Sequence, residues 1–211
     1  MLFRSNIPYT ILLGAASSTD SNYIGADPVD LFLTNQDNDT AGVTVSTPSG
    51  TSTSEAGTAV SFTIKLNSEP TANVTIPISS SDTTEGTVSP ASLIFTAANW
   101  NTPQTVVVTG VNDNLDDGDI VYSAVIGVLT SSDGLYNAIN PADISLTNLD
   151  DDTAGITVSA PFGTTTTEAG GTVTFTVRLD TQPTASVTIP ISSSDTTEGT
   201  VSASKIGRAH V

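Results

Sequence analysis

The sequence has no cysteine, one methionine and one tryptophan, and only 5 basic residues (Lys and Arg) against 22 acidic ones. Without cysteine there is no disulfide, thiolate nucleophile or cysteine-bound zinc. The net charge of -17 and the shortage of Lys and Arg exclude a phosphate-binding surface for nucleic acid, and equally argue against an anionic membrane surface. No apolar run approaches the roughly 18 residues that a transmembrane helix needs, so we expect no membrane insertion.

The residues for catalysis are also scarce. The single histidine is His210, next to the last residue, and neither a glycine-rich phosphate loop nor a catalytic serine motif occurs. Paired carboxylates cleave glycosides in some enzymes. Here a near-identical set of acids recurs along the chain, which favours a structural role. We therefore predict that the protein is not an enzyme.

The two ends of the chain differ in kind from the rest. Residues 205–211 can be encoded by AAG ATC GGA AGA GCA CAC GTC, which after its first base resembles a common sequencing-library adapter. Residues 1–5 can be encoded by the reverse complement of the same adapter. We expect both segments to be non-native and leave them out of fold reasoning. Lys65 and Arg178 are then the only basic residues.

An internal repeat organises the remaining residues. Residues 37–89 recur 113 residues later as 150–202, with 38 of the 53 aligned positions identical. The segment before residue 37 keeps the same spacing: Tyr9, Asp20, Tyr23, Pro28 and Asn35 match Tyr122, Asp133, Tyr136, Pro141 and Asn148. A period of this length fits a small domain repeated in tandem.

The repeat predicts three native segments within a longer protein. Residues 6–36 are expected to be the C-terminal part of a preceding repeat. Residues 37–149 are expected to form one complete repeat, and residues 150–204 the N-terminal half of a following one. Neighbouring copies of the same repeat are therefore the expected partners.

The hydropathy pattern within the repeat is typical of β-structure. Alternating apolar and polar residues, separated by clusters of Gly, Pro, Asn and Asp, predict strands at 43–45, 60–66, 74–78, 92–95, 105–109, 120–128 and 143–147. Pro77 lacks an N–H group and is expected at an edge or facing outward. The serine- and threonine-rich stretch 49–54 is expected to be an exposed loop. About seven short strands in roughly 110 residues predict an all-β fold of immunoglobulin-like Greek-key sandwiches.

The acidic residues gather in the predicted turns. Glu55 lies between the first two predicted strands, Asp82 and Glu85 follow the strand at 74–78, and further acids crowd residues 113–119 and 150–152. In a Greek-key sandwich, alternate turns return to the same end, so several of these acids are expected to converge. Converged carboxylates repel one another unless a cation lies between them, and Ca²⁺ takes six to eight oxygen ligands of this kind. Solvated acidic turns remain the alternative interpretation.

At these residues the sequence resembles the Calx-β family, calcium-binding immunoglobulin-like modules found in sodium/calcium exchangers and in long bacterial surface proteins. The resemblance implies Ca²⁺ as the bound ion. It implies the following ligands: Glu55, Asp82, Asn112, Asp113, the backbone of Leu115, Asp117, Asp150, Asp151 and Asp152. Asn112 stands where the family pattern usually has a second acid, which would lower the charge of the site.

The expected function is mechanical. The resemblance implies a non-catalytic stalk or spacer of a large bacterial adhesin or fibre, secreted or at the cell surface, made rigid by Ca²⁺ at the junctions between modules. A cell-surface or glycan ligand would be bound by other parts of the full protein. Two alternatives are an accessory carbohydrate-binding module of a secreted enzyme, with Trp100 stacking on sugar, and a calcium-sensing regulatory module. For Trp100 a packing role is favoured.

Overall fold

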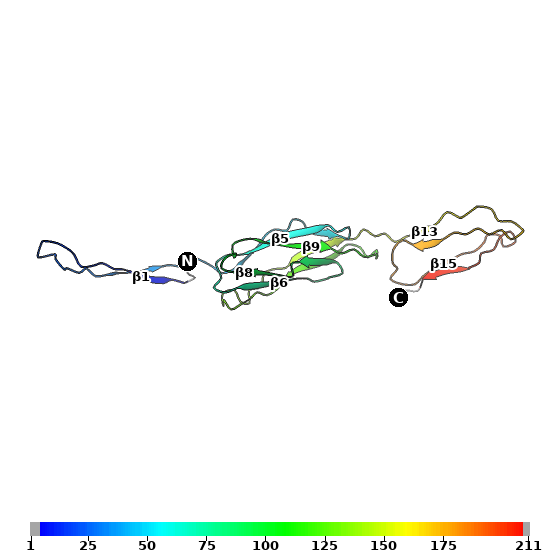
Figure 1. Cartoon of the computed structure of the whole chain (residues 1–211). Coiled ribbons are helices and arrows are strands. Elements are labelled where there is room, and N and C mark those ends of the chain that lie inside the picture. The colour runs from blue at the N-terminus through cyan, green and yellow to red at the C-terminus, as the bar shows by residue number, and fades with distance from the viewer. Residues whose placement is uncertain (1–4, 209–211) are drawn as a thin grey trace.

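The computed structural model describes residues 5–208, and every regular element in that range is a β-strand (Figure 1). The all-β, immunoglobulin-like fold predicted from the hydropathy pattern is therefore confirmed. Residues 1–4 and 209–211, which belong to the adapter-like ends, lie outside the described residues. None of the described residues forms a helix capable of crossing a membrane.

The first sheet of the central sandwich follows the alternation in the sequence. In order across the sheet it contains β3 (Val43–Val45), β5 (Ala59–Leu66), β9 (Gln104–Gly110) and β7 (Gly86–Ser89). In β5 every second residue from Val60 to Leu66 is buried, because successive side chains of a strand point to opposite faces. All pairings within this sheet are antiparallel.

The second sheet covers the other side of the core. In order across the sheet it contains β11 (Thr130–Ser131), β6 (Val74–Ser80), β10 (Ile120–Ile126), β12 (Ile144–Leu149) and β4 (Ser52–Ser54), with β8 (Ser92–Phe95) also paired to β6. The pairing of β12 with β4 is parallel and the others are antiparallel. The orders β3-β5-β9-β7 and β6-β10-β12 correspond to the ABED and CFG sheets of an immunoglobulin domain.

The buried core of the described chain lies between these two sheets. Its fully buried side chains include Phe62, Phe95, Tyr136 and Leu146, and all of them fall within residues 60–146. Trp100 is half-buried and packs against this core, which confirms the packing role expected for it.

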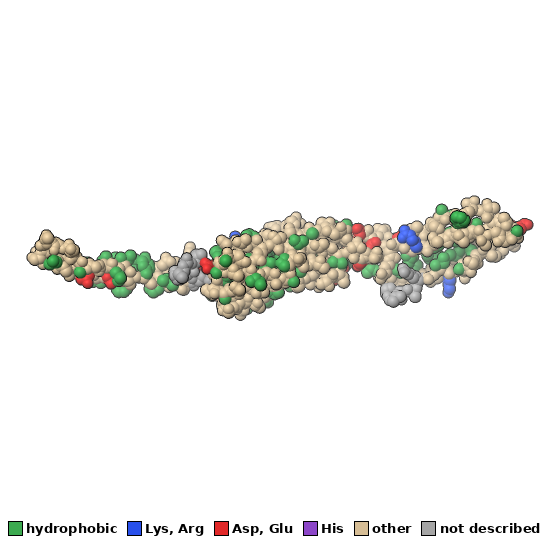
Figure 2. Space-filling view, viewed as in Figure 1, with side chains coloured by type: hydrophobic (Ala, Val, Ile, Leu, Met, Phe, Trp, Pro, Cys, Tyr) green, Lys and Arg blue, Asp and Glu red, His purple; other side chains and the backbone are tan. Residues whose placement is uncertain are grey.

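Shorter pairs of strands flank the central sandwich on both sides (Figure 1). They are the hairpin β1 (Ile7–Ile11) with β2 (Leu31–Asn35), then β13 (Ile156–Val158) with β14 (Val177–Leu179), and β15 (Val187–Pro190) with β16 (Lys205–Arg208). The hairpin exposes apolar side chains on its surface (Figure 2). Phe32, for example, is 80% exposed. β16 lies in the adapter-like segment 205–211.

Two local predictions have different outcomes. Pro77 is exposed, with its side chain directed away from the core, as its missing N–H group required. The stretch 49–54, by contrast, is only partly a loop: residues 52–54 form β4, and the Thr53 side chain is fully buried. The loop prediction was wrong there because a buried polar residue among serines and threonines gives no hydrophobic alternation.

Candidate metal centre

The parallel pairing of β4 and β12 brings two acidic segments together. Because parallel strands end at the same edge of a sheet, the residues that follow Ser54 and Leu149 lie side by side. The amide of Glu55 continues this pairing by donating a hydrogen bond to the Leu149 carbonyl, 3.0 Å away. Glu55 therefore lies next to Asp150 and the two acids that follow it.

Three carboxylates form a cluster, which we call the three-acid cluster: Glu55, Asp150 and Asp152. One carboxylate oxygen from each residue lies within 4.8 Å of the others. Glu55 is 6% exposed, and the other two side chains are half-buried. Figure 2 shows acidic side chains gathered where the central sandwich meets the following segment. The expected convergence is thus present for Glu55, Asp150 and Asp152, whereas the Asp151 side chain is exposed.

The pKa values of the cluster report crowding of negative charge. Burial, together with the charges of Asp113, Asp150 and Asp152, raises the pKa of Glu55 from 4.5 to about 7. Burial and the neighbouring acids, Asp150 first among them, also raise the pKa of Asp152. Hydrogen bonds from the backbone amides of Asp152 and Gly118 instead lower the pKa of Asp150. Asp150 is thus the member held ionised, beside two carboxyls that resist ionisation.

The donor atoms of the cluster fit a hard divalent cation. Every candidate ligand atom is a carboxylate oxygen, the type that Ca²⁺ and Mg²⁺ prefer. The Oδ2 atom of Asp152 is buried and has no hydrogen-bond partner, although buried polar atoms are rarely left unpaired. In the part of the chain that the structure describes, no basic side chain pairs with these acids.

The acidic loop, residues 111–119, borders the three-acid cluster. Asp113 lies close enough to raise the pKa of both Glu55 and Asp152, and its Oδ1 accepts a hydrogen bond from the Leu115 amide at 2.7 Å. The amide of Asp117 donates to Asp150, while the Asp117 side chain is exposed. Asn112 donates from Nδ2 to the Asp113 carbonyl. The Asp151 amide faces Glu55 Oε2 at 3.5 Å, and the Asp151 side chain is exposed.

Asp82 occupies a different local setting. Its Oδ1 accepts hydrogen bonds from the amide and the hydroxyl of Thr84, at 3.0 and 2.6 Å, and these bonds lower its pKa. Asp195, one repeat later, makes the same pair of bonds to Thr197. The carboxylate of Asp82 is therefore engaged in closing its own turn, and it is not a member of the three-acid cluster.

Two members of a buried polar network, Thr53 and Asn148, lie two residues before Glu55 and Asp150, and neither was predicted from the sequence. Asn148 donates from Nδ2 to the Val111 carbonyl at 3.1 Å and faces Glu85 Oε2 at 3.4 Å. Its Oδ1 accepts from the Thr53 hydroxyl, which is also bonded to the hydroxyl of Tyr122. The network ties the start of the acidic loop to β4 and β12. The recurrence of Asn148 as Asn35 was the available signal.

The backbone arrangement at the junction recurs one repeat earlier. The Asp150 amide donates to Asp119 Oδ1 and the Asp152 amide to Asp150 Oδ1, at 3.2 and 2.8 Å. At the preceding junction, the Asp37 amide donates to Asn6 Oδ1 and the Asp39 amide to Asp37 Oδ1, at 2.8 and 3.0 Å. Similar geometry at positions 113 residues apart follows from the repeated sequence.

No family model matches this chain, and no curated protein does. Among solved structures, the chain is similar to one described as "Structure of WR4, a C.elegans MSP family member". The two share 9% sequence identity with a TM-score of 0.31, over 54% of this chain and 99% of that one.

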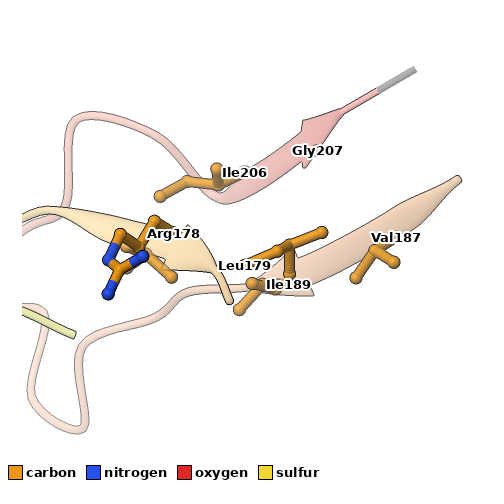
Figure 3. A pocket seen from close by; sticks show the side chains of 7 residues that line it. Arg178, Leu179, Val187, Ile189, Ile206 and Gly207 are labelled. Atoms are coloured by element: carbon orange, nitrogen blue, oxygen red, sulfur yellow. The ribbon is translucent and has the colours of Figure 1, made fainter. Parts of the chain in front are cut away.

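A cavity of about 310 Å³ lies between β14, β15 and β16 (Figure 3). Val177, Leu179, Val187 and Ile189 line it, and they match in the repeat four core residues of the central sandwich: Ile64, Leu66, Val74 and Ile76. Ile206 and Gly207 of the adapter-like segment close its other side. The cavity is therefore the counterpart of a sandwich core, and we assign it no ligand.

The raised pKa of Glu55 predicts how the stability of the metal-free protein depends on pH. Between 4.5 and about 7 the folded protein holds a proton on Glu55 that the unfolded chain has released. The free energy of unfolding should therefore fall as pH rises through this range, by at most about 1.4 kcal/mol per pH unit, and level off above it. Denaturant unfolding in EDTA from pH 5 to 8 measures this.

Glu55→Gln is the matched variant for the pH experiment, because the amide keeps the shape and cannot ionise. Its stability should fall less over the same range, because the raised pKa of Asp152 is then the remaining contribution of this sign from the cluster. Asp82 and Asp150, whose pKa values are lowered from 3.8, contribute stability that is lost only at more acidic pH. An equal slope in the wild type and Glu55→Gln would show that Glu55 is not the titrating group.

Proposed function

We propose that this chain is a calcium-stabilised structural repeat, Calx-β-like, from the stalk or spacer of a long extracellular bacterial protein. The observation that carries the proposal is the three-acid cluster, with its buried, unpartnered Asp152 Oδ2, at the point where one repeat meets the next. Tandem repetition supports a spacer over a sensor, because a sensor gains little from many equal copies.

The chemistry of the site favours Ca²⁺ as the ion. Glu55, Asp150 and Asp152 would hold it, with Asp113 alongside. The family resemblance implies Asn112, Leu115, Asp117 and Asp151 as further ligands. It also implies Asp82, but the carboxylate of Asp82 is engaged with Thr84. Bound Ca²⁺ would supply positive charge between carboxylates that otherwise repel one another. Mg²⁺ fits less well, because it keeps most of its water. Extracellular modules of this kind bind Ca²⁺ at about 10⁻⁴–10⁻³ M, so ambient calcium would keep the site loaded.

Thermal unfolding with and without calcium tests the proposal. Trp100 is the only tryptophan and packs against the core of the central sandwich, so its fluorescence reports unfolding of that sandwich. Calcium at about 100 times its dissociation constant adds about 2.7 kcal/mol of stability. The midpoint should therefore rise by about 10 °C relative to EDTA. An unchanged midpoint up to 10 mM calcium, a concentration of about 10–100 times the expected dissociation constant, would contradict the proposal.

A further inference from the structure

The acidic loop is held at both ends by the central sandwich. At its start, the Val111 amide donates to the Glu85 carbonyl and the Val111 carbonyl accepts from Asn148. Near its end, the Gly118 amide donates to Asp150 Oδ2 at 2.8 Å. The tip of the loop, residues 114–116, therefore projects from a fixed base, and Asn114 and Asp116 are exposed.

Two hydrogen bonds join this tip to the following segment. The Gln182 amide donates to the Asn114 carbonyl at 2.7 Å, and the Ala154 amide donates to Asp116 Oδ2, also at 2.7 Å. Gln182 lies in the turn between β14 and β15, whereas Ala154 lies just before β13. A single contact would leave the two parts free to rotate, but two contacts from separate donors fix a relative orientation.

The two donors belong to one local unit of the following segment. The Asp180 amide donates to the Gly155 carbonyl at 2.9 Å, and β13 pairs with β14 directly beyond that bond. The central sandwich contains the same arrangement, in which the Asn67 amide donates to the Gly42 carbonyl at 2.9 Å. The bond that holds the two donor segments together is therefore present at the start of both of these copies.

We propose that residues 114–116 form a docking surface whose partner is the start of the next repeat, recognised through the backbone N–H groups of Ala154 and Gln182. The inference goes beyond the proposed function, because neither contact uses an atom of the three-acid cluster. Docking sets the angle between consecutive repeats. By this account hydrogen bonds to the central sandwich hold the base of the acidic loop, and the Asn114 carbonyl and the Asp116 carboxylate at its tip hold the neighbour.

Distance measurements between two spin labels test the docking. The chain has no cysteine, so Thr105→Cys on β9 and Thr188→Cys on β15, both exposed positions, give a single labelled pair in the full chain. In calcium the doubly labelled protein should give one narrow distance distribution. Gln182→Pro removes the amide donor and Asp116→Ala removes the acceptor. Each change should lower the docked-to-undocked ratio about fivefold and broaden the distribution.

Matched variants separate docking from general disturbance. Gln182→Ala keeps the N–H group and Asp116→Asn keeps an acceptor oxygen, so both should retain the narrow distribution. If Asp116→Ala kept the narrow distance distribution, the proposal would be overturned, whatever the result for Gln182→Pro. A broad distance distribution in the doubly labelled protein without further changes would overturn it as well. The calcium-dependent rise in melting temperature is read separately on the same proteins. If calcium did not raise the melting temperature while the distance distribution stayed narrow, the proposed function would be overturned but the docking proposal would not.

Discussion

Replacing Gly110 with alanine is expected to destabilise the central sandwich by about 3 kcal/mol. A Cβ at this position would collide with the Ser54 carbonyl oxygen and crowd Asn148 Oδ1. Both obstacles are fixed, since Ser54 is backbone of β4 and Asn148 is buried in the polar network. The melting temperature, followed by Trp100 fluorescence, should fall by about 10 °C or more.

The same methyl group should also weaken calcium binding. Ser54 directly precedes Glu55, and Asn148 lies two residues before Asp150. If the added methyl group displaces Ser54 or Asn148 from β9, Glu55 and Asp150 move apart in the three-acid cluster. Gly134→Ala is the matched control, because a Cβ at Gly134 meets no atom within 4 Å. If Gly110→Ala had the same melting temperature as Gly134→Ala and the wild type, the close approach of β9 to β4 would not exist in solution.

Neutralising two members of the cluster is the second change with a large expected effect. In Asp150→Asn/Asp152→Asn the rise in melting temperature on adding calcium, about 10 °C in the wild type, should be lost. In EDTA the melting temperature should change little, because relief of the repulsion that raises the pKa values of Glu55 and Asp152 is offset by the loss of one backbone hydrogen bond that Asp150 accepts. Thermal unfolding in calcium and in EDTA measures both effects.

A control with the same change of charge isolates the position of the acids. Asp27→Asn/Glu198→Gln also removes two negative charges, at exposed residues outside the cluster. It should keep the full calcium response. Equal loss of the response in both double variants would mean that calcium acts by general screening, and a full response in Asp150→Asn/Asp152→Asn would show that calcium binds elsewhere.

The larger strands could be predicted from the sequence because burial follows their alternation. In β5 the buried positions 60, 62, 64 and 66 are the apolar ones, and β3 and β8 have the predicted bounds. β4 and β7 were not predicted, because Ser52–Ser54 and Gly86–Ser89 are short and carry few apolar residues. β4 is held instead by its parallel pairing and by the buried hydroxyl of Thr53.

The candidate site could be predicted only in outline. Turn acids and Greek-key connectivity were enough to expect Glu55 beside residues 150–152, and the structure brings Asp150 and Asp152, but not the exposed Asp151 side chain, to Glu55. The sequence did not reveal that Asp82 closes its own turn with Thr84, since that depends on the local backbone path. The role of Asn148 was also missed, because a neutral amide on a strand has no charge or hydropathy signature and its recurrence as Asn35 was the one available signal.

Crystallography of the full chain grown in calcium tests the central claim most directly. The account predicts one anomalous scattering peak at the three-acid cluster, with carboxylate oxygens of Glu55, Asp150 and Asp152 at about 2.3–2.6 Å from it. The peak should be missing from crystals of Asp150→Asn/Asp152→Asn. Wild-type crystals in which Glu55 and Asp152 face water, with no ion between them at millimolar calcium, would contradict the account.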